Sequence, residues 1–360
     1  MQLTNRCGRW RLIRLCAIGF ALGVIAQAAQ PIYIGLDTNP PPKEGVSDAA
    51  KRKWFAKGLR AGVTQVSLAP TWNSVEKIPG KYNFDGIDYQ AKLAKENNLP
   101  IYLNIRIIDT NNRALPTPYA KWDFDDPRLV ERLINLIHAI APRVKGQVHW
   151  ISIGNEVDSY FASHGNEIAA YRKLMDDVIG TVHSSFPGAL FTVNFTFNGL
   201  DQINKKYQPI TEITDFTSLT YYPMNPDFTF RDPNDVAGDF AKMFEAAHGK
   251  RIFFQELGYA SSTRVNSSEE KQARFMDNVL HTLGKYRGQT IAAHFVWMSD
   301  IPLSLVNMFG EYYKLPNSDK FKAFLASLGY FNRDGRPKQA WSVFEREAGA
   351  LSHPKTAEVR

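Results

Sequence analysis

Eight apolar runs of strand length, spread from residue 32 to residue 297, constrain the fold of this chain more than any other feature. Most of them are near-continuous rather than alternating, which is typical of parallel strands covered on both faces. The runs occupy residues 32–37, 63–70, 101–107, 148–154, 190–195, 216–222, 252–255 and 291–297. A sheet built from such strands needs helices on its outer face.

Amphipathic stretches fill the gaps between these runs. Helices are predicted over residues 48–61, 85–97, 127–144, 166–185, 234–247 and 268–286. Asn234 and Ser268 are expected to cap the last two of them, and the gap at residues 198–214 gives the weakest helical pattern. Eight strand–helix repeats predict an α/β protein with one (β/α)8 barrel.

Two segments near the end of the chain complete this barrel. Residues 300–318 are expected to form a long loop beside the active face, where loops of that length are usually substrate walls. After a turn at Asp334-Gly335, a helix that starts near Pro337 is expected to close the ring. The predicted catalytic domain therefore spans residues 29–360.

Residues 1–28 have a different character. Arg6, Arg9, Arg11 and Arg14 form a basic start, an apolar run follows, and residues 26–28 (Ala-Gln-Ala) fit a small-x-small cleavage site. The apolar run is short for a bilayer span, which needs about 20 residues. We therefore expect a signal peptide over residues 1–28 and a secreted or periplasmic protein, with an uncleaved anchor as the alternative.

Removal of this segment changes what the composition implies. The segment carries four arginines and no acid, so its loss lowers the formal net charge from +7 to +3. This charge gives no reason to expect nucleic acid or, after cleavage, a membrane as a partner. Cys7 and Cys16 leave with the segment, so no disulfide is expected. The histidines lack metal-binding spacing and no phosphate or dinucleotide motif occurs, so no metal and no cofactor are expected. The protein is also expected to be a monomer.

Polar and aromatic residues follow the predicted strands. In a (β/α)8 barrel the carboxyl ends of all eight strands meet at one rim. Carbohydrates need paired donors and acceptors together with aromatic faces, so this rim resembles a sugar site. The residues at the strand ends are Asp37, Trp72, Arg106, Asp109, Asn155, Glu156, Asn194, Asn198, Tyr221, Tyr222, Glu256 and Trp297.

Two of these residues are glutamates on strands four and seven, which face each other across the ring. Glycoside cleavage needs one protonated carboxyl group to assist the leaving oxygen and one ionised carboxylate. Glu156 and Glu256 are the predicted pair. A separation of about 5–5.5 Å between them would predict retention of configuration, and about 6.5–9.5 Å would predict inversion.

The motifs around this pair resemble the clan A glycoside hydrolases, which are retaining (β/α)8 enzymes. The resemblance rests on Gly154-Asn155-Glu156, on Glu256 and on Trp297, and it covers nearly all of residues 29–360. Residues 154–157 (Gly-Asn-Glu-Val) resemble the plant-type endo-β-1,3-glucanases. Residues 219–223 (Leu-Thr-Tyr-Tyr-Pro) resemble the endo-β-1,4-galactanases.

This resemblance implies roles for individual residues. Glu156 would be the acid/base and Glu256 the nucleophile. Asn155 would bind the sugar 2-hydroxyl group, and Trp297 would form the floor of the subsite for the cleaved sugar. Tyr221 or Tyr222 would bond the nucleophile; neighbouring side chains on a strand point in opposite directions, so only one of them faces the mouth, and we expect Tyr221.

Structural alternatives exist for several of these residues. Glu256 could instead be a structural acid paired with Arg106, although such a cation would also keep a nucleophile ionised. Trp297 could be core packing, and Trp72 either a subsite wall or packing. Asp37 either contacts substrate or caps a loop. Asn194 is assigned to the site only by its place at a strand end.

The expected function is a metal-independent retaining endo-β-glycanase that acts on a polysaccharide or oligosaccharide by double displacement. Endo action is inferred from the long loop after strand eight, which suggests an open cleft. A transglycosylase would use the same two carboxyl groups but exclude water. A non-catalytic carbohydrate-binding barrel would need aromatic residues at the rim but not both acids.

Overall fold

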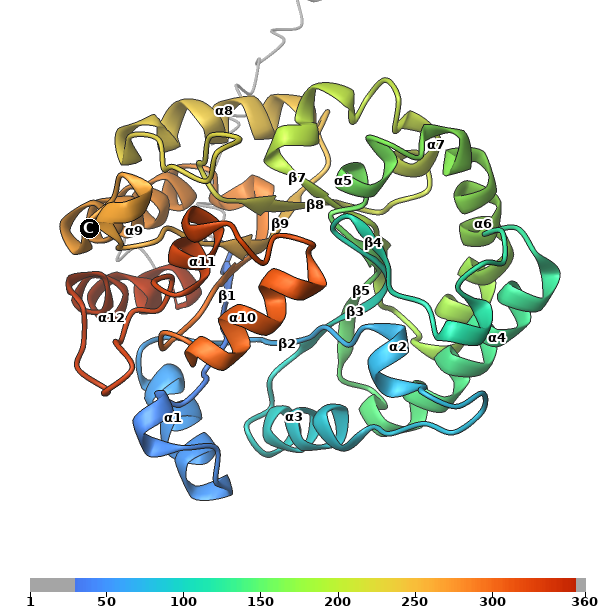
Figure 1. Cartoon of the computed structure of the whole chain (residues 1–360), viewed down its shortest axis with the longest axis horizontal. Coiled ribbons are helices and arrows are strands. Elements are labelled where there is room, and N and C mark those ends of the chain that lie inside the picture. Colours follow the sequence, from blue (N-terminus) through green and yellow to red (C-terminus); the bar gives the residue numbers. More distant parts are fainter. Residues whose placement is uncertain (1–29, 354–360) are drawn as a thin grey trace, which may run out of the picture. The chain divides into compact units, whose positions relative to one another are not determined.

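The computed structural model describes residues 30–353, and the predicted signal peptide at residues 1–28 lies outside this range. Helices surround a ring of parallel strands, as Figure 1 shows, so the predicted (β/α)8 barrel is confirmed. The strands are β1 (Tyr33–Leu36), β2 (Val66–Leu68), β3 (Ile101–Asp109), β4 (Asn112–Arg113), β5 (Val148–Asn155), β6 (Leu190–Thr192), β7 (Asn194–Thr196), β8 (Thr217–Tyr221), β9 (Ile252–Leu257) and β10 (Thr290–Phe295).

Each predicted strand is present. The fifth is interrupted at Val193, which divides it into β6 and β7. One sheet has the order β1-β10-β9-β8-β7 and the other β2-β3-β5-β6, and β4 adds an antiparallel hairpin to β3. Between β1 and β2 the carbonyl of Ile34 accepts from the backbone N–H groups of Thr64 (2.8 Å) and Gln65 (3.2 Å). These two bonds join the sheets on the side opposite the Val193 interruption.

The helices mostly match the predicted ones. They are α1 (Asp48–Arg60), α2 (Trp72–Val75), α3 (Asp85–Glu96), α4 (Pro127–Ile140), α5 (Val157–Phe161), α6 (Ile168–Ser185), α7 (Gln208–Thr211), α8 (Val236–Ala246), α9 (Glu269–Lys285), α10 (Leu303–Tyr312), α11 (Asp319–Leu325) and α12 (Gln339–Ser352). Ser268 caps α9 by accepting from the N–H of Lys271. The predicted cap at Asn234 is wrong, because the side chain of Asp232 accepts from the N–H of Asn234 instead.

The segment after the eighth barrel strand differs from its prediction. Residues 300–318 were expected to be loop, but Leu303–Tyr312 forms the helix α10, and α11 follows at Asp319–Leu325. Pro302 precedes α10, a position where a missing N–H costs nothing. Ser318 caps α11 by accepting from the N–H of Phe321. Both helices lie beside the mouth of the ring in Figure 1.

The interior of the ring changes character from bottom to top. A small apolar cluster containing Tyr102, Trp150 and Phe253 fills its lower part. Above it lies a buried polar layer, in which Tyr102 Oη donates to Ser152 Oγ at 2.9 Å and Asn104 Nδ2 donates to Gln255 Oε1 at 3.0 Å. Polar groups buried this deeply need partners, and this layer supports the strand ends that carry the predicted site.

Candidate active site

Glu156 lies where β5 turns into α5. Gly154 (φ 99°) and Glu156 (φ 49°) both adopt left-handed backbone conformations, which glycine tolerates far better than other residues. A Cβ atom at Gly154 would lie 2.6 Å from Tyr171 Oη. The N–H of Glu156 donates to Asn194 Oδ1 at 3.0 Å, and Thr110 Oγ1 donates to Glu156 Oε2 at 2.6 Å. This sharp turn directs the carboxyl group into the barrel mouth.

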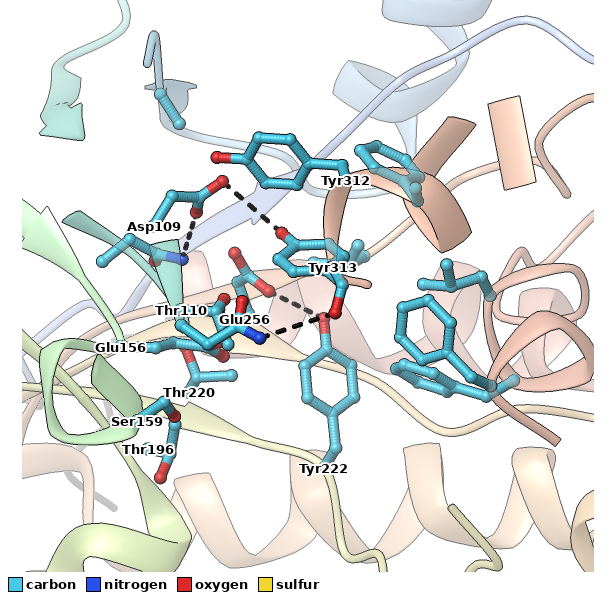
Figure 2. A pocket seen from close by; sticks show the side chains of 18 of the residues that line it. Asp109, Thr110, Glu156, Ser159, Thr196, Thr220, Tyr222, Glu256, Tyr312 and Tyr313 are labelled. Atoms are coloured by element: carbon cyan, nitrogen blue, oxygen red, sulfur yellow. Dashed lines mark hydrogen bonds between the residues drawn. The ribbon is translucent and has the colours of Figure 1, made fainter. Parts of the chain in front are cut away.

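Glu256 lies near the end of β9 and is held by two donors. Arg106 Nη2 donates to Oε1 at 3.0 Å, and Tyr222 Oη donates to Oε2 at 2.8 Å. Figure 2 shows the side chains of Glu156, Glu256 and Tyr222 directed into the same pocket. A guanidinium and a hydroxyl that donate to separate oxygens of one carboxyl group fix its orientation.

The carboxyl group of Glu156 has a shifted pKa. Burial, and secondly the charge of Glu256, raise its pKa from 4.5 to about 8, against the opposing effect of the Thr110 hydrogen bond. Glu156 is therefore protonated at neutral pH. Arg106 is a cation beside the two glutamates. Burial alone would lower its pKa, but the carboxylates of Asp109 and Glu256 raise the pKa overall.

A chain of hydrogen bonds connects these groups. Asn155 Nδ2 donates to Asp109 Oδ1 at 2.9 Å, and Arg106 Nη1 donates to the same oxygen at 3.2 Å. Gln255 Nε2 donates to Asn155 Oδ1. Because Asn155 is buried and engaged on both sides, its amide has one defined orientation, with one N–H left for a ligand.

The pocket around these residues has a volume of about 800 Å³, which is within the usual range for small-molecule sites. Of the residues predicted at the strand ends it brings together Asp37, Arg106, Asp109, Asn155, Glu156, Asn198, Tyr222, Glu256 and Trp297. Asp37 Oδ1 is bonded to His294 Nε2 at 3.0 Å. Trp297 stacks on Phe309 with the ring planes 8° apart.

Three predicted site residues do not line the pocket. Tyr221 is fully buried and donates to Asp239 Oδ2 at 2.9 Å, so the expected preference for Tyr221 is wrong and Tyr222 is the tyrosine at the mouth. Trp72 is also fully buried, and its Nε1 donates to Glu76 at 2.6 Å, which is a packing role. Asn194 is buried beneath the rim, where it orients the backbone of Glu156.

The sequence reading missed several lining residues. Thr110 belongs to the β3–β4 hairpin, which continues β3 past the expected strand end. Tyr312 and Tyr313 come from the end of α10, and Tyr313 Oη is 3.5 Å from Asp109 Oδ2. The adjacent tyrosine pair in the segment after strand eight was the available signal. The prediction of a substrate-wall loop at residues 300–318 names no individual residue, so it does not single out this pair.

Within residues 30–353, no group of three or more His, Cys, Asp or Glu side chains is placed to bind a metal ion. None of the helices in this same part of the chain is both long and apolar enough to cross a membrane.

Comparisons with known proteins show similarity at the level of fold. No protein-family model matches the sequence, and no curated protein matches it significantly. The structure of GH5_18 from Streptomyces cattleya in complex with GlcNAc has a TM-score of 0.68 and 14% identity; the match covers 92% of this chain and 82% of that chain.

Two further solved structures are similar. Exo-β-1,4-mannosidase Op5Man5 from Opitutaceae bacterium strain TAV5 has a TM-score of 0.66 and 19% identity, with 90% of this chain and 60% of that chain covered. Native xylanase 10B from Thermotoga maritima has a TM-score of 0.60 and 16% identity, with coverages of 88% and 95%. All three are glycoside hydrolases built on a (β/α)8 barrel, which is the fold of this chain.

Proposed function

We propose that this protein is a retaining β-glycoside hydrolase in which Glu156 is the acid/base and Glu256 the nucleophile. One observation carries the proposal: in a single pocket, a glutamic acid with a raised pKa faces a second glutamate held by an arginine and a tyrosine. Two carboxyl groups in different protonation states are what glycoside cleavage requires. The glycosidases among the similar structures support the same reading.

The proposed reaction has two steps. In the first, a Glu256 oxygen forms a bond to the anomeric carbon while the bond to the leaving oxygen breaks, and Glu156 gives its proton to that oxygen. In the second, Glu156, now ionised, takes a proton from water as the water oxygen attacks the anomeric carbon. The bond to Glu256 breaks, and both carboxyl groups return to their starting states.

The neighbouring residues have supporting roles in this proposal. Arg106 and Tyr222 fix the Glu256 carboxylate so that one oxygen can approach the anomeric carbon. The free N–H of Asn155 is available to the sugar 2-hydroxyl group. The face of Trp297 forms a wall against which the C–H face of a sugar can stack.

Trapping of the intermediate tests the double-displacement step. A 2-deoxy-2-fluoro glycoside with an activated leaving group should add the mass of one fluorosugar, located by peptide mapping on Glu256. Glu156→Ala should be partly rescued by azide with an activated aryl glycoside. Labelling of another residue, or the absence of both labelling and rescue in an active preparation, would contradict the assignment.

The finer parts of the proposal concern the substrate and its location. We keep endo cleavage of a β-linked polysaccharide, with motifs nearest to the β-1,4-galactanases and β-1,3-glucanases, as a prediction. The loop from which endo action was inferred is helical, so that inference loses its original basis. Chromatographic sizing of products from a panel of β-linked polysaccharides separates endo from exo action. Secretion stays a prediction and is tested by N-terminal sequencing of exported protein.

Transglycosylation by the same pair is the second candidate. Part of the pocket is lined by apolar residues such as Met308, Phe309 and Leu328. This surface favours transglycosylation, because it hinders the approach of water to the glycosyl-enzyme. Product analysis with an added sugar acceptor separates it from hydrolysis. A non-catalytic binding barrel predicts no turnover in either assay.

A further inference from the structure

One side of the active-site pocket is built from apolar side chains of segments that are distant in sequence. They follow β8, or they belong to α10, to α11, or to the residues between and after these two helices. We call this surface the apolar wall. It consists of Met224, Phe228, Met308, Phe309, Leu315, Phe321, Phe324, Leu325 and Leu328.

The apolar wall is packed and joined directly to the catalytic centre. Phe228 contacts Phe321 and Phe324, with ring centroids 5.1 and 6.4 Å apart. The ring of Tyr222, whose hydroxyl group donates to Glu256, lies edge-on to Phe324 with centroids 5.3 Å apart. A ligand bound at Glu256 therefore meets this wall without crossing an intervening polar surface.

The conformation of Phe228 indicates that its place in the wall is specific. Its φ of 63° is left-handed, which is unusual for a bulky residue. The turn that holds it is tied to α11, because Asp227 accepts from Lys320 Nζ at 2.6 Å and from the N–H of Thr229 at 3.1 Å. The backbone thus keeps a large ring at the pocket surface despite a conformational cost.

The wall also reaches the outside of the molecule. Met308 lines the pocket and is 56% exposed, so apolar surface continues from the catalytic centre to the rim. The same pocket also carries Asp37, Arg106, Asp109 and Asn155, which are polar or charged. The pocket therefore combines polar groups suited to hydroxyl groups with an apolar wall suited to hydrocarbon.

We infer that the substrate is an amphiphilic glycoside, namely a sugar that carries an alkyl or acyl chain; this inference rests on the proposed function. Sugar rings stack on aromatic faces, but the hydroxyl groups of a second sugar would lose hydrogen bonds against phenylalanine, leucine and methionine side chains. A hydrocarbon chain loses nothing there and gains from burial. The chain is either the leaving group or an ester on the cleaved sugar.

Kinetics with a chain-length series test the inference. For each of several sugars, kcat/KM is measured with methyl, butyl and octyl β-glycosides below their micelle concentrations, and with methyl glycosides esterified by acetate or octanoate. Each buried methylene should raise kcat/KM by up to about fourfold. A rise in the alkyl series identifies the leaving group as the apolar part, and a rise only in the ester series identifies the substituent. No rise in either series would overturn the inference.

A variant and a matched control locate the effect. Phe228→Asn removes the ring and keeps a residue that tolerates the left-handed conformation. In whichever series shows the rise, it should lower the long-to-short-chain ratio of kcat/KM (octyl to methyl, or octanoate to acetate) about tenfold. Leu303→Asn removes an apolar side chain from α10 that is 59% exposed and outside the pocket lining, and it should leave the ratio unchanged. Equal ratios in wild type and Phe228→Asn would contradict the role of the wall.

The two proposals fail in different ways. If glycosides are cleaved without dependence on chain length, the inference fails and the proposed function stands. If no glycoside is cleaved, the proposed function fails, and calorimetric binding to Glu256→Gln still tests the wall. Tighter binding of the octyl than of the methyl glycoside to that variant supports it, and equal binding overturns it.

Discussion

At the scale of single residues, the site depends on a difference between two glutamates. Burial keeps Glu156 protonated, while Glu256 receives donors from Arg106 and Tyr222. The pairing of Glu256 with Arg106 is compatible with a structural role. The same contact also suits a nucleophile, because it holds the carboxyl group in one position. Substitutions of Glu256 and of Glu156 are therefore expected to affect activity, pH dependence and stability in different ways.

Glu256→Gln keeps the shape of the side chain and removes its charge and nucleophilicity. We expect kcat to fall by at least about a thousandfold. The melting temperature should change little, because the amide oxygen can still accept from Arg106 or Tyr222. Activity within tenfold of wild type, in a preparation free of contaminating enzyme, would exclude Glu256 as the nucleophile.

The pH dependence of the reaction should report the proton on Glu156. Because its pKa is raised to about 8, kcat/KM should fall as the pH rises through that value and the acid ionises. Thr110→Val removes a donor that favours the ionised form, so the alkaline limb should move to higher pH. A limb that stays in place in this variant would argue that another group controls it.

Replacement of Glu156 by glutamine should raise stability at alkaline pH while it lowers activity. A folded-state pKa above the ordinary 4.5 means that Glu156 contributes stability below that value, which is lost as the pH rises through about 8. Glu156→Gln stays neutral throughout. Near pH 8 the free energy of unfolding of the variant should exceed that of wild type by up to about 4 kcal/mol, while activity is lost. Denaturant unfolding at pH 5 and pH 8 checks the difference.

At the scale of elements, the repeating strands of the barrel were predicted from the sequence, whereas helix α10, which is not part of the repeat, was not. Each barrel strand is a continuous apolar run, so its existence follows from burial on both faces. Helix α10 was not predicted; it begins after Pro302 without a side-chain cap, so the start signal that marks other helices is weak there. The choice between Tyr221 and Tyr222 was wrong because alternation along a strand shows that they differ, but not which one faces inward.

The junction of β5 and α5 gives an element-scale prediction. Gly154→Ala would place a Cβ atom 2.6 Å from Tyr171 Oη in a residue with φ of 99°. We expect the free energy of unfolding to fall by about 2 kcal/mol or more, with lower activity because Glu156 shifts. Gly180→Ala in α6, where nothing lies within 4 Å of the added atom, is the control and should stabilise by about 0.5–1 kcal/mol. Equal effects in the two variants would contradict the packing argument.

At the scale of the whole barrel, each sheet supplies one of the two acids. Glu156 follows β5 in the sheet β2-β3-β5-β6, whereas Glu256 belongs to β9 in the other sheet. The described chain joins these sheets at Val193 and between β1 and β2. Changes at either junction can therefore alter the spacing of the two carboxyl groups without touching the site.

Thr64→Val tests this dependence. It removes the Oγ1 acceptor of the Ile34 N–H, 3.0 Å away, at the β1–β2 junction. We expect a loss of about 1–2 kcal/mol in stability and a larger loss of kcat/KM than Thr214→Val produces. Thr214 is the control because its hydroxyl bonds Thr211 and Lys250 away from the pocket. Equal kinetic losses in the two variants would show that the junction does not set the geometry of the pair.

The interruption at Val193 also has a consequence for a chain that is divided at this residue. A half-barrel that ended there would keep either Glu156 or Glu256, but never both. Under the proposed function, reactivity toward glycosides should emerge only when the two halves are reunited, whether in one chain or from separately expressed pieces.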